Sequence, residues 1–248
     1  MLATLPELSL FLTVACAVIV GGVVKGAFGI GFPAVAMSIL PLFVPPALAV
    51  TILALPIVVT NIQQLTSYPD WRGVVRRFWV AGATGAVTIL IVSQFLDDAP
   101  APVLAICIGA ALVIFALTGL FKLNLRASDS LPWQVGVGLG SGVIGGLTAI
   151  KAPTMIYTAA LDLPRDMFVA TAGFLFLSTG VGLLTGLFAG SMLDAVSLPL
   201  SVAAVVAAML GFKIGEAIRH RLNPALFRKL LLWLMLLLGL RMIAVNLV

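Results

Sequence analysis

Two lysines stand inside apolar segments that glycine and proline interrupt. Lys25 lies in GGVVKGAFGIGFPAV (21–35), and Lys151 lies in GLTAIKAPT (146–154). A lysine inside a membrane costs about 2.5–3.5 kcal/mol on the insertion scale, so such residues are usually paired or functional. Neither interrupted region contains an Asp or Glu that could neutralise its lysine. A small anionic substrate could do so, although either lysine could instead snorkel to a membrane interface.

The glycines and prolines near these lysines predict helices that start inside the membrane. Gly29 and Gly31 free the backbone before Pro33, and proline suits the first turn of a helix because no amide donor is needed there. Pro153 has the same position after Lys151. A helix N-terminus carries unpaired amide groups and the positive end of the dipole, which both favour an anion. Two such ends, approaching the midplane from opposite faces, would face one oxyanion site.

Polar side chains at membrane depth could complete this site. Most Ser and Thr residues in membrane helices bond their own backbone, whereas the amide of Asn61 is harder to satisfy in that way. Further polar residues at depth are Thr51, Thr60, Gln63, Gln64, Thr171, Ser178 and Thr179. The predicted substrate site comprises Lys25, Gly29, Gly31, Pro33, Asn61, Gly145, Gly146, Thr148, Lys151, Pro153, Thr154 and Tyr157. Close helix packing is the alternative interpretation of the glycines.

The composition identifies the class of protein that holds these residues. The chain has 248 residues, of which 62% are hydrophobic and 9% are charged, and its mean hydropathy is +1.22. Soluble domains are about 25% charged, so we expect a polytopic membrane protein. Backbone groups in lipid need internal partners, and apolar runs such as LLLWLMLLLGL (230–240) lack the alternation of barrel strands. The expected fold class is therefore all-α.

Hydropathy and loop charge predict the topology. We expect spans at 47–67, 77–96, 101–121, 166–188, 196–213 and 229–247, and interrupted hairpins at 8–43 and 133–161. The connections 68–77, 122–132 and 213–229 carry several Arg and Lys residues, whereas 97–100 and 189–195 hold Asp without a base. The positive-inside rule places the basic connections in the cytoplasm and both chain termini outside. The N-terminal MLATLPELS has no basic residue, so no signal peptide is expected.

The two halves of the chain have the same order of predicted elements. Three glycines recur at one constant spacing, and a proline follows them in each half: Gly22, Gly26, Gly29 and Pro33, then Gly138, Gly142, Gly145 and Pro153. We therefore expect a first repeat at 1–121, a cytoplasmic linker at 122–132 and a second, inverted repeat at 133–248. Inverted repeats with broken helices at the midplane are typical of secondary transporters that work by alternating access.

Other functional classes lack support in the sequence. The single histidine, His220, lies in a basic loop, and no nucleophile elbow or zinc-binding pair is present, so no enzyme, metal site or cofactor is predicted. The net charge of +5 is explained by cytoplasmic loops and attraction to lipid headgroups, not by nucleic acid. An anion channel and a carrier of small carboxylates remain as alternatives, and a homo-oligomer is compatible with the sequence.

Three segments of the sequence are similar to those of a known family. They are GVVKGAFGIGFPAVAMSILPLF (22–43), PPALAVTILALPIVVTNIQQLTSYPDWRGVVRRF (45–78) and GSGVIGGLTAIKAPTMIYTAALDLP (140–164). On these segments the chain resembles the sulfite exporter TauE/SafE family of bacterial membrane transporters. The resemblance implies a protein of the bacterial inner membrane that exports sulfite, small organosulfonates or related carboxylates. Two local features differ from the family pattern: the glycine run is GIGFP, and an extra turn carries Lys151.

Overall fold

Every regular element in the described part of the chain is helical, which confirms the predicted all-α fold class. The computed structural model describes residues 5–121, 126–194, 197–218 and 224–247, and these ranges contain no strand. The elements are α1 (Leu5–Phe28), α2 (Phe32–Ile39), the 3-10 turn η1 (Leu40–Leu42), α3 (Pro46–Thr66), α4 (Trp71–Ser93), α5 (Ala101–Leu120), α6 (Leu131–Thr148), α7 (Ala152–Ala160), α8 (Arg165–Ala189), α9 (Ser197–Ile218) and α10 (Pro224–Leu247). His220 and parts of the connections 122–132 and 213–229 lie outside the described residues.

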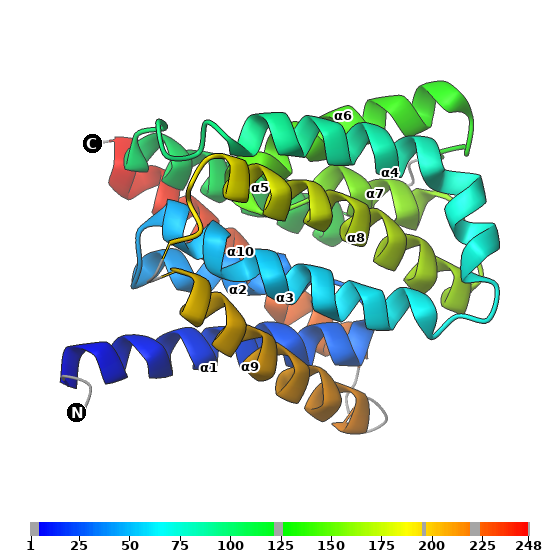
Figure 1. The fold of residues 1–248 in the computed structure, drawn as a ribbon. Coiled ribbons are helices and arrows are strands. Elements are labelled where there is room, and N and C mark those ends of the chain that lie inside the picture. Colours follow the sequence, from blue (N-terminus) through cyan, green and yellow to red (C-terminus); the bar gives the residue numbers. More distant parts are fainter. Residues whose placement is uncertain (1–4, 122–125, 195–196, 219–223, 248) are drawn as a thin grey trace.

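Seven helices within these ranges are long and apolar enough to cross a membrane: α1, α3, α4, α5, α8, α9 and α10. In Figure 1 the start of α1 and the end of α10 lie at one end of the bundle, and the turn between α3 and α4 lies at the other. Large apolar side chains such as Val87, Leu210 and Leu237 point outward and remain exposed. Such a surface suits lipid, so the chain is a multi-pass membrane protein.

The start of α4 shows how local chemistry shifts a predicted boundary. The side chain of Asp70 accepts a hydrogen bond of 3.1 Å from the amide of Gly73, which caps the helix at its N-terminus. α4 therefore begins at Trp71, whereas the predicted span begins at residue 77. The basic residues Arg72, Arg76 and Arg77, expected in a loop, lie on the first two turns of this helix.

Glycine allows α1 to lie unusually close to α9. A side-chain carbon at Gly22 would meet the backbone of α9 at Ala208 and Gly211. One at Gly26 would meet the carbonyl oxygen of Phe212. Small residues at this spacing let two membrane helices approach until their backbones touch. The first helix of the chain is thus packed against a helix that lies beyond the linker (Figure 1).

α6 also packs closely against α4 through glycines. A side-chain carbon at Gly138 would meet the backbone of Ala81 and Gly85, and one at Gly142 would meet Thr88. α1 and α6 are each the first helix on their side of the linker, and α9 and α4 are each the fourth. The pairing of α1 with α9 therefore has a counterpart in the pairing of α6 with α4.

Candidate functional site

The first helix break separates α1 from α2 at residues 29–31. Gly29 and Gly31 have φ values of +82° and +100°, a region of backbone conformation that glycine adopts without strain. The amide of Gly29 donates to the carbonyl oxygen of Lys25 at 2.7 Å, which closes the last turn of α1. Gly31 is the N-cap of α2, and Pro33 lies in its first turn. The chain thus reverses within a short, glycine-dependent segment.

The second helix break separates α6 from α7 at residues 149–151. Ala149, at the C-cap of α6, has a φ of +57°, so here an alanine takes the left-handed conformation. The hydroxyl of Thr148 accepts a hydrogen bond of 3.1 Å from the amide of Ile150. The same hydroxyl donates to the carbonyl oxygen of Ile144 at 2.7 Å. Thr148 therefore holds the break together, and Lys151 follows as the N-cap of α7, with Pro153 in the first turn of α7.

Lys25 is directed into the protein from the last turn of α1. Its Nζ donates to Oδ1 of Asn61 at 2.6 Å and to Oγ1 of Thr60 at 3.1 Å, both on α3. The residue is 3% exposed. The amide nitrogen of Asn61 donates in turn to the carbonyl oxygen of Ile57 at 2.6 Å, which fixes the orientation of the acceptor. Two of the three ammonium hydrogens of Lys25 are thus committed to neutral groups.

Lys151 is fully buried and its ammonium group has no hydrogen-bond partner among the described residues. The Nζ lies 5.6 Å from the centroid of the Phe176 ring of α8, within the range of a cation–π interaction. Gly145 makes room for the stem of the side chain, because a carbon added there would lie 3.0 Å from Cγ of Lys151. The three hydrogens of this ammonium group therefore remain available to a ligand.

The register between α3 and α8 relates the two lysines to each other. Gly173 of α8 faces the side chain of Gln64, and Gly180 of α8 faces Ile57. Seven residues forward along α8 thus correspond to seven residues backward along α3, so the two helices are antiparallel in a fixed register. Residue 61 of α3, three before Gln64, is therefore at the same level as residue 176 of α8, three after Gly173.

This register places Asn61 opposite Phe176. Asn61 holds the ammonium group of Lys25, and the ring of Phe176 lies beside the ammonium group of Lys151. The two lysines, from the two helix breaks, therefore converge on one level of the helix pair.

An apolar cluster at the same level also joins the two breaks. Met155 of α7 packs with Ala172 and Phe176 of α8, and Ile30 from the first break packs against this cluster. The N-terminal ends of α2 and α7 are therefore held near the same part of α8. Within the described chain, no carboxylate forms an ion pair with Lys25 or Lys151, and no group of metal-ligating side chains is found.

Two of the predicted site residues instead contact neighbouring elements of the second break. The hydroxyl of Thr154 donates to the hydroxyl of Ser141 at 2.8 Å, which joins α7 to α6. Gly146 lies against Val92 and Ser93 of α4, so it serves the packing of α6 on α4.

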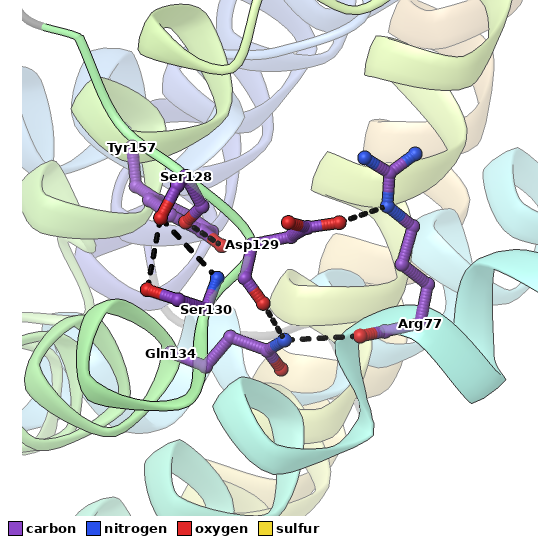
Figure 2. A network of polar contacts seen from close by, with 6 residues as sticks. All are labelled: Arg77, Ser128, Asp129, Ser130, Gln134 and Tyr157. Atoms are coloured by element: carbon purple, nitrogen blue, oxygen red, sulfur yellow. Dashed lines mark hydrogen bonds and ion pairs between the residues drawn. The ribbon is translucent and has the colours of Figure 1, made fainter.

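Tyr157 belongs to a polar network at the linker between the halves (Figure 2). Its hydroxyl donates to the carbonyl oxygen of Ser128 at 3.1 Å, and its ring stacks on Trp133. Gln134, in the first turn of α6, donates to the carbonyl oxygens of Asp129 at 2.7 Å and Arg77 at 3.0 Å. The structure thus groups Tyr157 with residues 128–134, and not with the two lysines.

Three residues outside the predicted set have an unpaired polar atom or contact one of the two lysines. The side chain of Gln64 donates to the carbonyl oxygen of Val169 at 2.6 Å, but its Oε1 is buried without a partner among the described residues. The buried hydroxyl of Thr171 also lacks a partner there. Both residues stood among the polar side chains expected at depth. Phe176 had no such signal, because an aromatic residue in an apolar helix is indistinguishable from a packing residue.

The comparisons with known proteins place the chain in a family. The family model "Sulfite exporter TauE/SafE" matches residues 14–242. No curated protein and no solved structure matches the chain. The matched range contains both helix breaks, both buried lysines and all or most of each helix in the bundle. The chain therefore belongs to the sulfite exporter TauE/SafE family.

Proposed function

We propose that the protein is a secondary transporter that exports a small sulfur-containing oxyanion, such as sulfite or an organosulfonate, across the membrane. The observation that carries this proposal is the buried ammonium group of Lys151, which has no partner among the described residues. A charge removed from water without a partner is costly, and a bound anion offsets that cost. The three unpaired N–H groups of Lys151 can donate hydrogen bonds to the oxygens of a sulfonate or sulfite.

Access to this site would alternate between the two sides of the membrane. The recurrent helix pairings, α1 with α9 and α6 with α4, support two inverted repeats at 1–121 and 133–248. In transporters built from such repeats, one repeat rocks against the other around a fixed central site. The two breaks would then open the site to opposite sides, the first hairpin (8–43) from outside and the second (133–161) from the cytoplasm.

Export of an anion needs no coupling ion in this scheme. The cytoplasm is electrically negative, and moving one charge through 100 mV releases about 2.3 kcal/mol. We therefore expect uniport driven by the membrane potential. Removing a proton gradient at a fixed potential should leave the export rate unchanged.

The test compares two lysine variants in proteoliposomes. Vesicles are loaded with sulfite, and efflux is measured under a potassium-diffusion potential for the wild type, for Lys151→Met and for Lys213→Met. Lys213 is exposed near the end of α9, so its variant controls for the loss of a positive charge. We expect saturable efflux from the wild type and Lys213→Met, and at least a tenfold loss in Lys151→Met. Equal efflux from both variants would remove Lys151 from the site, and unsaturable electrical conductance would indicate a channel.

A further inference from the structure

Residues 127–130 of the linker form a strap that joins the end of α7 to α4 and α6 (Figure 2). The amide of Ala127 donates to the carbonyl oxygen of Ala160, the last residue of α7, at 3.2 Å. The carbonyl oxygen of Ser128 accepts a hydrogen bond of 3.1 Å from the hydroxyl of Tyr157. Two consecutive residues of the strap therefore hold α7, one through its backbone and one through a side chain.

The other end of the strap is fixed to α4 and α6. Gln134 of α6 is buried, and its side-chain amide donates to the carbonyl oxygens of Asp129 and Arg77. Its Oε1 accepts a hydrogen bond of 3.3 Å from the amide of Ala81. The exposed ion pair of Arg77 with Asp129 adds a contact that contributes little. The strap thus has an end anchored by a buried amide and an end attached to α7 by two hydrogen bonds.

α7 connects the strap to the buried lysine of the second break. The helix has nine residues, so it is about 14 Å long. Lys151 is the N-cap at its start, and Ala160 is the last residue at its end. A short helix moves as a rigid element, so a displacement of the strap end of α7 also displaces Lys151. Lys151 is 0% exposed, so its site is closed while the strap is attached.

We propose that the strap is a gate: it closes the second hairpin while it holds α7, and it releases α7 when the site opens on that side of the membrane. This inference rests on the proposed function and adds a closing device to one side of the site. The bonds suit reversible release, because Ser128 is exposed and water can replace the hydroxyl of Tyr157. The sequence predicts a cytoplasmic linker, so the strap would control the entry of an exported anion.

A disulfide across the strap tests whether release is needed. Ala127→Cys and Ala160→Cys are combined in a protein whose native cysteines, Cys16 and Cys107, are replaced by alanine. Efflux of 2-hydroxyethanesulfonate from proteoliposomes is measured after oxidation and again after reduction, since sulfite itself cleaves disulfides. We expect at least a tenfold loss of efflux on oxidation and recovery on reduction. Oxidation should leave the variant with Ala127→Cys alone unaffected.

A second measurement follows the opening without relying on transport. Ser141 of α6 is 1% exposed and accepts a hydrogen bond of 2.8 Å from Thr154 of α7, so a thiol at this position becomes reactive when α7 moves away. The reaction of Ser141→Cys with a maleimide is timed in detergent. It should slow at least about threefold in the oxidised pair and accelerate by a similar factor with Tyr157→Phe, which keeps the ring stacked on Trp133. Tyr68→Phe removes the other tyrosine hydroxyl of the chain and should leave the rate unchanged.

The outcomes separate the gate from the proposed function. If the oxidised pair transports as fast as the reduced pair, the strap does not need to open and the inference is overturned. Failure of the disulfide to form also overturns it, because the two joined residues are then not neighbours. If the wild type transports neither sulfite nor the organosulfonate, the proposed function fails and the maleimide rates decide alone. Equal rates in the oxidised pair, in Tyr157→Phe and in the control then overturn the gate, whereas the expected order supports it.

Discussion

The Nζ of Lys25 lies 2.6 Å from Oδ1 of Asn61, and this contact ties the end of α1 to α3. Hydrogen bonds to a charged group are stronger than bonds between neutral groups, and a buried donor that loses its acceptor is costly. The contact therefore has a structural role besides its role in the site. It holds the last turn before the first helix break in place while leaving part of the ammonium group open.

Replacing Asn61 by leucine should destabilise the protein by about 1–3 kcal/mol, because Lys25 then has Thr60 as its remaining acceptor. The measurement is thermal unfolding in detergent, followed by tryptophan fluorescence. In the double variant Lys25→Met with Asn61→Leu, no ammonium group is left unsatisfied. The double variant should therefore be more stable than the sum of the two single effects predicts. Strict additivity would show that the two residues are not coupled.

Replacing Gly26 by alanine should lower the melting temperature and weaken the contact of α1 with α9. The added carbon would strike the carbonyl oxygen of Phe212, a backbone atom that cannot rotate away. Gly136→Ala is the matched control, since nothing lies within 4 Å of a carbon added there. Alanine is favoured over glycine in a helix by about 1 kcal/mol, so the control should be neutral or slightly stabilising. Equal melting temperatures for both variants would contradict the close packing.

Replacing Gly31 by alanine should impair both stability and transport. Its φ of +100° is unfavourable for residues with a side chain, and we expect a cost of about 1–2 kcal/mol. The new carbon would also lie 3.3 Å from Cγ1 of Val24. The same change at Gly140, inside α6, meets only ordinary contacts with Pro153 at 3.6 Å. Unfolding and efflux are measured for both variants. If Gly31→Ala has the stability and the efflux rate of the wild type, the break does not need this backbone conformation.

Replacing Gln134 by leucine should destabilise the protein more than replacing Asp129 by alanine. Gln134 is buried, and its loss leaves the carbonyl oxygens of Arg77 and Asp129 without this donor (Figure 2), at a cost of about 1–3 kcal/mol. The ion pair of Arg77 with Asp129 is 2.8 Å long, but its side chains are 42% and 46% exposed. Exposed pairs contribute about 0–1 kcal/mol and are screened by salt.

Denaturation of both variants at low and high salt tests this order. The difference between Asp129→Ala and the wild type should shrink at high salt, whereas the deficit of Gln134→Leu should persist. A larger loss in Asp129→Ala, or a deficit of Gln134→Leu that disappears in salt, would indicate that the ion pair dominates the linker.

The positions of both breaks could be read from the sequence, because glycine and proline act locally on the backbone. Gly31 before Pro33 gives the start of α2, and Pro153 gives the start of α7. The left-handed conformation of Ala149 could not be read in this way, because alanine does not signal it. The predicted start of α4, residue 77, lies six residues after the observed start at Trp71. A hydropathy average leaves out the charged first turns of this helix, which the side chain of Asp70 caps.

The relation between the site residues required the tertiary structure. Asn61 was predicted as a substrate ligand, but its bond to Lys25 depends on the packing of both α1 and α3 against α9. The position of Phe176 beside Lys151 depends on the packing of α7 against α8. Sequence patterns describe one helix at a time, so they indicate which residues are polar at depth but not which of them meet. Tyr157 illustrates this limit, because its hydroxyl bonds to the linker at Ser128.

The crossed pairings of α1 with α9 and of α6 with α4 have a consequence for biogenesis. The helices before the linker and the helices after it cannot each complete their packing alone. The first helix of each group, α1 or α6, packs against a helix of the other group. During synthesis α1 enters the bilayer long before its partner α9 has been made. Until then, the glycine-lined face of α1 contacts lipid or the insertion machinery. The bundle can be completed only after α9 has been synthesised.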